Sequence, residues 1–137
     1  MCVDPGTRSI GFALSDPEGR VALRRGSIQA RTLPSDARAI AELAREEGVD
    51  VLVIGLPLRT DGKQGRQESR ARELARLVAG LLPGVRVELM DERFSTQAAR
   101  RLLAGAGVSS RRFKRIKDGA AAAWLLQGYL DAQKGRT

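Results

Sequence analysis

The chain of 137 residues contains no histidine and only one cysteine, Cys2. A single cysteine excludes an intramolecular disulfide and a zinc site built from thiolates. The absence of histidine excludes serine–histidine and cysteine–histidine hydrolysis and any imidazole metal ligand. If this protein is a hydrolase, its carboxylates must do the chemistry, and carboxylates favour a hard divalent cation.

Long apolar segments and aromatic residues are also scarce. The most apolar stretch, residues 51–58, is too short to cross a bilayer, and the chain reaches Asp4 without the apolar run of a signal peptide. We therefore expect a soluble, cytoplasmic protein that does not bind a membrane. Aromatic residues make up 4% of the chain, so base stacking is not expected as the main mode of recognition.

Basic residues are in excess. Lys and Arg number 24 against 16 Asp and Glu, which gives a formal net charge of +8. Such a charge attracts phosphates, nucleic acid or an anionic surface, and electrostatics alone does not choose between them. The segment from Ser109 to Lys117 is the most basic, and we expect it to be an exposed, mobile loop. Its basic residues are Arg111, Arg112, Lys114, Arg115 and Lys117.

The length and the apolar periodicity predict one α/β domain spanning residues 1–137. Two extended segments meet at a turn over residues 16–19, and further strands are expected at 49–54 and 85–89. Helices are expected around 37–44, 74–82 and 98–103, with a last one starting at Asp118. Ser35 or Asp36 would cap the first helix, and Gly48 would end it. This order predicts a mixed sheet with helices on both faces.

Acidic residues fall at the ends of predicted strands and at the start of the last helix. They are Asp4, Asp91, Glu92 and Asp118. Ligand sites gather at such positions in α/β folds, so these carboxylates could converge on one or two Mg²⁺ or Mn²⁺ ions. Each also has a structural interpretation. Asp118 could cap its helix, and Asp4 could start a turn. Asp91 or Glu92 could pair with Arg93 or cap the helix that follows near Ser95-Thr96.

Four stretches, taken in order, resemble motifs of one known family, the YqgF (RuvX) family. They are residues 4–16 (DPGTRSIGFALSD), residues 53–58 (VIGLPL) with Asp61-Gly62 and Gly65, residues 91–96 (DERFST) and residues 118–127 (DGAAAAWLLQ). Together they span nearly the whole chain. Two features depart from the family pattern: only Met1-Cys2-Val3 precede Asp4, and Arg59 stands where asparagine is common.

The resemblance implies an RNase H-like fold, with a mixed five-stranded sheet flanked by helices, related to the RuvC resolvases. It implies a metal-dependent nuclease, acting on the 5′ end of pre-16S rRNA or, alternatively, on Holliday junctions. By motif match, Asp4, Glu92 and Asp118 would be the catalytic and metal-binding carboxylates, with Asp91 a further candidate ligand. Asp4 and Asp118 would share one Mg²⁺ or Mn²⁺ ion, and Glu92 would complete the site for a second.

The nucleic acid would be a structured RNA or a branched DNA, bound through backbone phosphates. The candidate contacts are Arg8, Arg59, Arg93, Arg111, Arg112, Lys114, Arg115 and Lys117. The protein would be a monomer or a homodimer, and a symmetrical junction would favour the dimer. A non-catalytic nucleic-acid-binding module is the alternative of another class, and the retention of all three carboxylates argues against it. The turn from Asp4 to Thr7 also suggests an actin-like ATPase. Such an enzyme needs two domains of this kind, and 137 residues supply only one.

Overall fold

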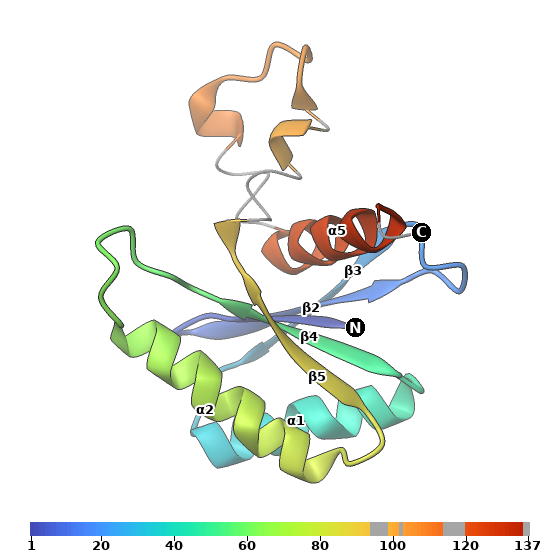
Figure 1. Ribbon diagram of the computed structural model, residues 1–137, viewed down its shortest axis with the longest axis vertical. Coiled ribbons are helices and arrows are strands. Elements are labelled where there is room, and N and C mark those ends of the chain that lie inside the picture. The colour runs from blue at the N-terminus through green and yellow to red at the C-terminus, as the bar shows by residue number, and fades with distance from the viewer. Residues whose placement is uncertain (94–98, 102, 114–119, 136–137) are drawn as a thin grey trace.

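Five strands form one sheet in the order β3-β2-β1-β4-β5 (Figure 1). The computed structural model describes residues 1–93, 99–101, 103–113 and 120–135. The strands are β1 (Cys2–Pro5), β2 (Ser9–Ser15), β3 (Ala22–Gln29), β4 (Val51–Leu56) and β5 (Arg86–Asp91). The first three pair antiparallel, whereas β4 runs parallel to both β1 and β5. The predicted mixed five-stranded sheet is confirmed.

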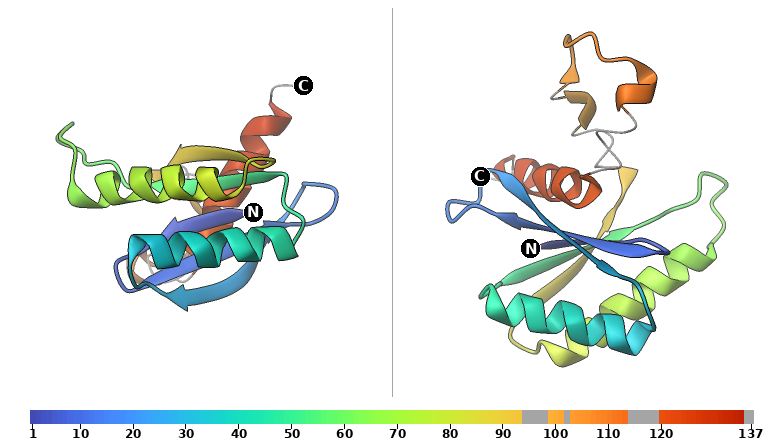
Figure 2. Two further views of the ribbon diagram at one scale, coloured as in Figure 1. Left: turned by 90° about the horizontal axis from the view of Figure 1, so that it is seen from below. Right: turned by 180° about the vertical axis from the view of Figure 1, so that it is seen from behind.

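Helices cover both faces of the sheet (Figure 2). Helices α1 (Leu33–Glu46) and α2 (Arg66–Leu81) lie on one face, and α5 (Ala121–Lys134) lies on the other. Strand residues alternate between two apolar clusters: Val3 and Ile54 pack under α1 and α2, whereas Cys2 and Val53 pack under α5. No helix in the described part of the chain is long and apolar enough to span a membrane.

Helix α1 begins earlier than the sequence predicts. Its N-cap is Thr32, whose Oγ1 accepts a hydrogen bond from the Ser35 N–H at 3.3 Å, so Ser35 and Asp36 are not the cap. The reason is Pro34, which fits the first helical turn because its missing N–H has no partner to lose there. The predicted end is confirmed, since Gly48 follows the C-cap with a φ of +62°.

Strand β4 is shifted by two residues from the predicted 49–54. The N–H of Val49 donates to the carbonyl of Ala44 at 3.0 Å and so belongs to the end of α1. At its other end the strand continues through Gly55 and Leu56, which pair with Met90 and Asp91 of β5. Both residues thereby become part of the rigid sheet beneath the candidate site.

The basic segment is not a loop throughout. Residues 110–113 form a helical turn, in which the Phe113 N–H donates to the Ser109 carbonyl at 2.8 Å. Ser109 Oγ caps the turn by accepting the Arg112 N–H at 3.2 Å, a local bond that favours a helical start. The loop prediction is therefore wrong for these residues, while Lys114, Arg115 and Lys117 lie outside the described residues. The last helix, α5, spans Ala121–Lys134, and its predicted start at Asp118 lies outside the described residues.

Candidate active site

The parallel strands β1, β4 and β5 bring their carboxyl ends to one edge of the sheet. Val3 pairs with Ile54, and Leu56 pairs with Asp91. Asp4 therefore stands at the end of β1 in line with the end of β4. Glu92 follows β5 directly, and its N–H donates to the Leu56 carbonyl at 3.1 Å. Asp4 and Glu92, far apart in sequence, thus reach the same edge.

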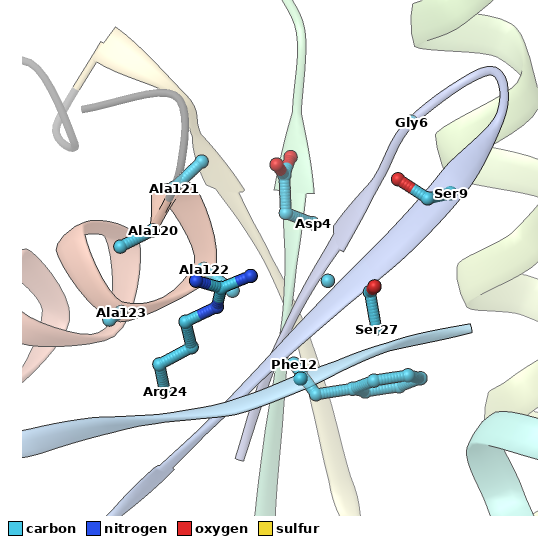
Figure 3. Close-up of a pocket in the computed structure, with 12 residues that line it drawn as sticks. Asp4, Gly6, Ser9, Phe12, Arg24, Ser27, Ala120, Ala121, Ala122 and Ala123 are labelled. Carbon is cyan, nitrogen blue, oxygen red and sulfur yellow. The ribbon is translucent and has the colours of Figure 1, made fainter. Parts of the chain in front are cut away.

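Asp4 faces the side of the sheet covered by α5. Cys2, two residues earlier, packs in the apolar cluster under that helix, and strand alternation places Asp4 on the same face. The half-buried Asp4 side chain lines a cavity of about 260 Å³ together with Gly11 and residues 120–123 (Figure 3). Gly11 lies between these two groups, since a Cβ there would be in ordinary contact with the Ala122 Cβ at 3.8 Å and the Asp4 Cβ at 4.0 Å.

Glu92 bends over β4 towards α5. A Cβ on Gly55 would stand 3.2 Å from Glu92 Oε1 and 2.9 Å from Leu125 Cδ1. Burial is the main cause that raises the pKa of the Cys2 thiol, and the negative charges of Asp4 and Glu92 raise it further. The charges of both carboxylates therefore reach the same buried thiol.

Asp91 has a different environment. Met90 packs under α5, so alternation turns Asp91 towards the opposite face. Its Oδ2 accepts a hydrogen bond from Arg93 Nε at 2.7 Å, and its Oδ1 accepts the Arg93 N–H at 2.9 Å. These bonds from Arg93 hold the pKa of the Asp91 carboxyl below its usual value. The alternative interpretation, that Asp91 pairs with Arg93, is confirmed.

The interpretation of Asp4 as the start of a turn is wrong. Asp4 lies within β1, and the turn after it is closed by the Gly6 N–H, which donates to the Ser9 carbonyl at 3.0 Å. The interpretation of Asp118 as a helix cap is not tested, and the N-cap of α5 is Ala120. Asp118 itself lies outside the described residues. Within the described ranges no group of three or more acidic, cysteine or histidine side chains could hold a metal ion.

The predicted phosphate contacts differ in their surroundings. Arg8, Arg111 and Arg112 are exposed. Arg59 is exposed too but paired, because its Nε donates to Asp61 Oδ1 at 3.1 Å. Arg93 is held by Asp91 as described above.

One cavity residue that the sequence did not single out is Arg24 of β3. No motif marks Arg24, and only the pairing of β3 with β2 brings it to the cavity.

The fold of this protein is RNase H-like and of the same type as that of RuvC. The Thermus thermophilus RuvC structure superposes with a TM-score of 0.60 at 15% identity, covering 97% of this chain and 94% of that one. The structure titled "T. thermophilus RuvC in complex with Holliday junction substrate" gives a TM-score of 0.59, also at 15% identity, covering 97% and 93%. At this identity the likeness concerns the fold alone.

The chain belongs to the RuvX family, whose model is described as Holliday junction resolvase and matches residues 1–132. A relative from Moorella thermoacetica is 44% identical over 131 residues, which is 96% of this chain and 93% of the relative. A relative from Myxococcus xanthus is 42% identical over 134 residues, covering 98% and 88%. Both carry the name "Putative pre-16S rRNA nuclease". The predicted family and fold are confirmed.

Proposed function

We propose that this chain is a metal-dependent nuclease that hydrolyses phosphodiester bonds of structured RNA during maturation of the 5′ end of 16S rRNA. The observation that carries the proposal is the meeting of Asp4 and Glu92 at the carboxyl ends of β1 and β5, over the buried Cys2. The relatives named for pre-16S rRNA support the choice of substrate. The net charge of +8 suits a polyanionic partner.

The residues at this edge fit a hard divalent cation. Asp4 is half-buried, lines the cavity, and has no hydrogen bond or ion pair with any described residue. Carboxylate oxygen is the donor that Mg²⁺ and Mn²⁺ prefer, and this chain has no histidine to offer instead. We propose Asp4, Glu92 and Asp118 as the ligands. Asp91 is left out because Arg93 holds both of its oxygens.

The chain's own residues would hold and orient the reacting strand. A bound divalent ion supplies stabilisation of the negative charge that builds on the phosphate during hydrolysis. The backbone at Asp4 is held because β1 is paired on both sides, and the backbone at Glu92 is held by its N–H bond to Leu56. Helix α5 covers the sheet beside Asp4 and leaves the cavity open to a phosphate. The backbone that carries both carboxylates is therefore in place before the substrate arrives.

Basic side chains would hold the phosphates on either side of the cut. Arg59 and Arg93 are oriented by Asp61 and Asp91, so less side-chain entropy is lost when they bind. The other proposed contacts would act mainly through their positive charge. They are Arg8, Arg111, Arg112, Lys114, Arg115 and Lys117.

The test is cleavage of two labelled substrates, a precursor 16S rRNA fragment and a four-way DNA junction, with Mn²⁺, Mg²⁺ or EDTA. We expect wild type to cut the RNA only with the metal. Asp4→Asn, Glu92→Gln and Asp118→Asn should each lower the rate about a hundredfold or more, since the cation contributes several kcal/mol. Glu42→Gln, on the exposed side of α1, removes the same charge and should cut at the wild-type rate.

Three outcomes would overturn all or part of the proposal. Metal-independent cutting would contradict the role of the carboxylates. Faster cutting of the junction than of the RNA would assign the protein to recombination. Binding without cutting, unchanged by all three substitutions, would make it a non-catalytic module.

A further inference from the structure

Strand β3 contains a β-bulge beside the candidate site. Ala13 of β2 pairs with Arg24, and the next β2 pair joins Phe12 to Gly26, so Arg25 has no partner. Gly26 has a φ of +97°, a backbone conformation that favours glycine. Bulges are common next to active sites, where the extra residue redirects a side chain.

The bulge sends two β3 side chains to the same face. Arg24 lies opposite Ala13, which packs under α5, and Ser27 lies opposite Gly11, which approaches Ala122. In a regular strand, residues three apart would point to opposite faces. Here Arg24 and Ser27 both line the cavity that holds Asp4. Figure 3 shows the Arg24 guanidinium beside the first turn of α5, with Asp4 across the cavity.

Arg24 differs from the paired arginines of the site. Arg59 and Arg93 each donate to a neighbouring aspartate, whereas Arg24 is exposed and has no ion-pair partner in the described part of the chain. With no anionic partner among the described residues, the guanidinium keeps its donors available to a ligand. Guanidinium groups bind phosphate oxygens through two parallel N–H donors. The cavity of about 260 Å³ has room for such a group.

We propose that Arg24 binds a backbone phosphate of the substrate strand next to the phosphodiester that reacts at Asp4. This inference rests on the proposed nuclease function and adds a binding residue from β3, the edge strand farthest from β5. The bulge then places a positively charged side chain of an edge strand, Arg24, in the cavity that Asp4 lines. Arg24 holds the strand and takes no part in proton transfer or metal binding.

The test compares Arg24→Gln, Arg24→Lys and Arg38→Gln with wild type. Arg38 is an exposed arginine of α1, on the other face of the sheet, so its variant matches the loss of charge. Binding of the labelled precursor rRNA fragment is measured by fluorescence anisotropy in EDTA across a series of salt concentrations. Single-turnover cutting is then measured with Mn²⁺ at increasing protein concentration. Thermal melting checks that each variant is folded.

We expect Arg24→Gln to weaken binding about threefold to tenfold, the worth of one hydrogen-bonded contact. Its slope of log K against log salt should be shallower by about 0.7 to 0.9, one phosphate contact. The half-saturating concentration should rise while the maximal cutting rate stays within about twofold, because the contact is made equally before and during reaction. Arg24→Lys should recover most of the salt slope, and Arg38→Gln should match wild type.

An unchanged salt slope in Arg24→Gln, or equal losses in Arg24→Gln and Arg38→Gln, would overturn the inference. In the second case diffuse net charge, rather than a specific contact, would explain the binding. Wild type that binds the RNA but never cuts it would overturn the nuclease function alone, since the binding arm in EDTA still tests Arg24. If wild type cuts the RNA and Arg24→Gln has an unchanged slope of log K against log salt, the nuclease function is supported and the Arg24 contact is excluded.

Discussion

The side chain of Glu92 lies directly against the backbone of Gly55. A Cβ on Gly55 would stand 3.2 Å from Glu92 Oε1 and 3.3 Å from Glu92 Cγ. The same Cβ would approach Leu125 Cδ1 of α5 to 2.9 Å, closer than real Cβ atoms come to other heavy atoms. The missing side chain at residue 55 therefore lets the candidate carboxylate and α5 both close over β4.

Gly55→Ala should disturb the site and the packing of α5 together. We expect the free energy of unfolding to fall by about 1 to 3 kcal/mol, because the added methyl overpacks a filled space. RNA cutting should fall as well, since Glu92 must move. Gly80→Ala is the matched control: nothing lies within 4 Å of its added Cβ, and it lies within α2. It should stabilise by about 0.5 to 1 kcal/mol. Urea unfolding measures the stability of both variants. A Gly55→Ala protein with wild-type stability and RNA cutting would contradict the close packing of Glu92 and Leu125 against Gly55.

Metal binding should be visible as stabilisation, without any substrate. Asp4 and Glu92 come to the same end of the sheet, at the ends of β1 and β5, where carboxylate oxygens could hold a divalent cation. We expect Mn²⁺ to raise the melting temperature of wild type, because a ligand that binds only the folded state stabilises it. Asp4→Asn should lose this rise and should melt no lower than wild type in EDTA. An equal rise in wild type and Asp4→Asn would exclude Asp4 as a ligand.

Asp36 is a buried carboxylate in the first turn of α1, with 2% of its surface exposed, and it stabilises the start of this helix. Its Oδ1 accepts the Arg31 N–H at 2.9 Å, and its Oδ2 lies 3.7 Å from the guanidinium of Arg70 in α2. Asp36→Ala should lower the free energy of unfolding by about 1 to 3 kcal/mol, because it leaves the Arg31 donor unsatisfied. Asp36→Asn, which keeps an acceptor, should lose less. Equal losses in the two variants by urea unfolding would show that packing, not hydrogen bonding, is the cause.

Asp16 should give the β2–β3 turn a pH dependence. Its Oδ1 accepts the N–H groups of Val21 at 2.8 Å and of Arg20 at 2.7 Å, and the Val21 bond is the main cause that lowers the pKa of Asp16 below 3.8. A lowered carboxyl pKa stabilises the fold above the unfolded value and loses that effect as pH falls through the folded value. Wild type should therefore exceed Asp16→Asn in stability at pH 6, and the gap should narrow below about pH 4. A gap that is constant with pH would contradict this.

Local signals in the chain predict most of the elements but few of their ends. The alternation in β2 and the apolar spacing in α2 are properties of neighbouring residues, so they can be read without knowing the fold. The cap of α1 is Thr32 rather than Ser35 or Asp36, because a proline in the first turn shifts the start of the helix. The charges of residues 110–113 favour a loop, whereas Ser109 caps a helical turn there.

Part of the candidate site can likewise be predicted from the sequence, and part of it cannot. Residue types alone established that any hydrolytic chemistry must use carboxylates, since the chain has no histidine and one cysteine. The order of four motifs was enough to place the chain in its family, because motifs at strand ends and helix starts are local patterns.

Only the tertiary structure decided which charged groups share a space. Strand pairing sets Asp4 beside the end of β4, separates Asp91 onto the other face, and brings Arg24 to the cavity through a bulge. Pairing register depends on contacts between residues far apart in the chain, so no local pattern could reveal it.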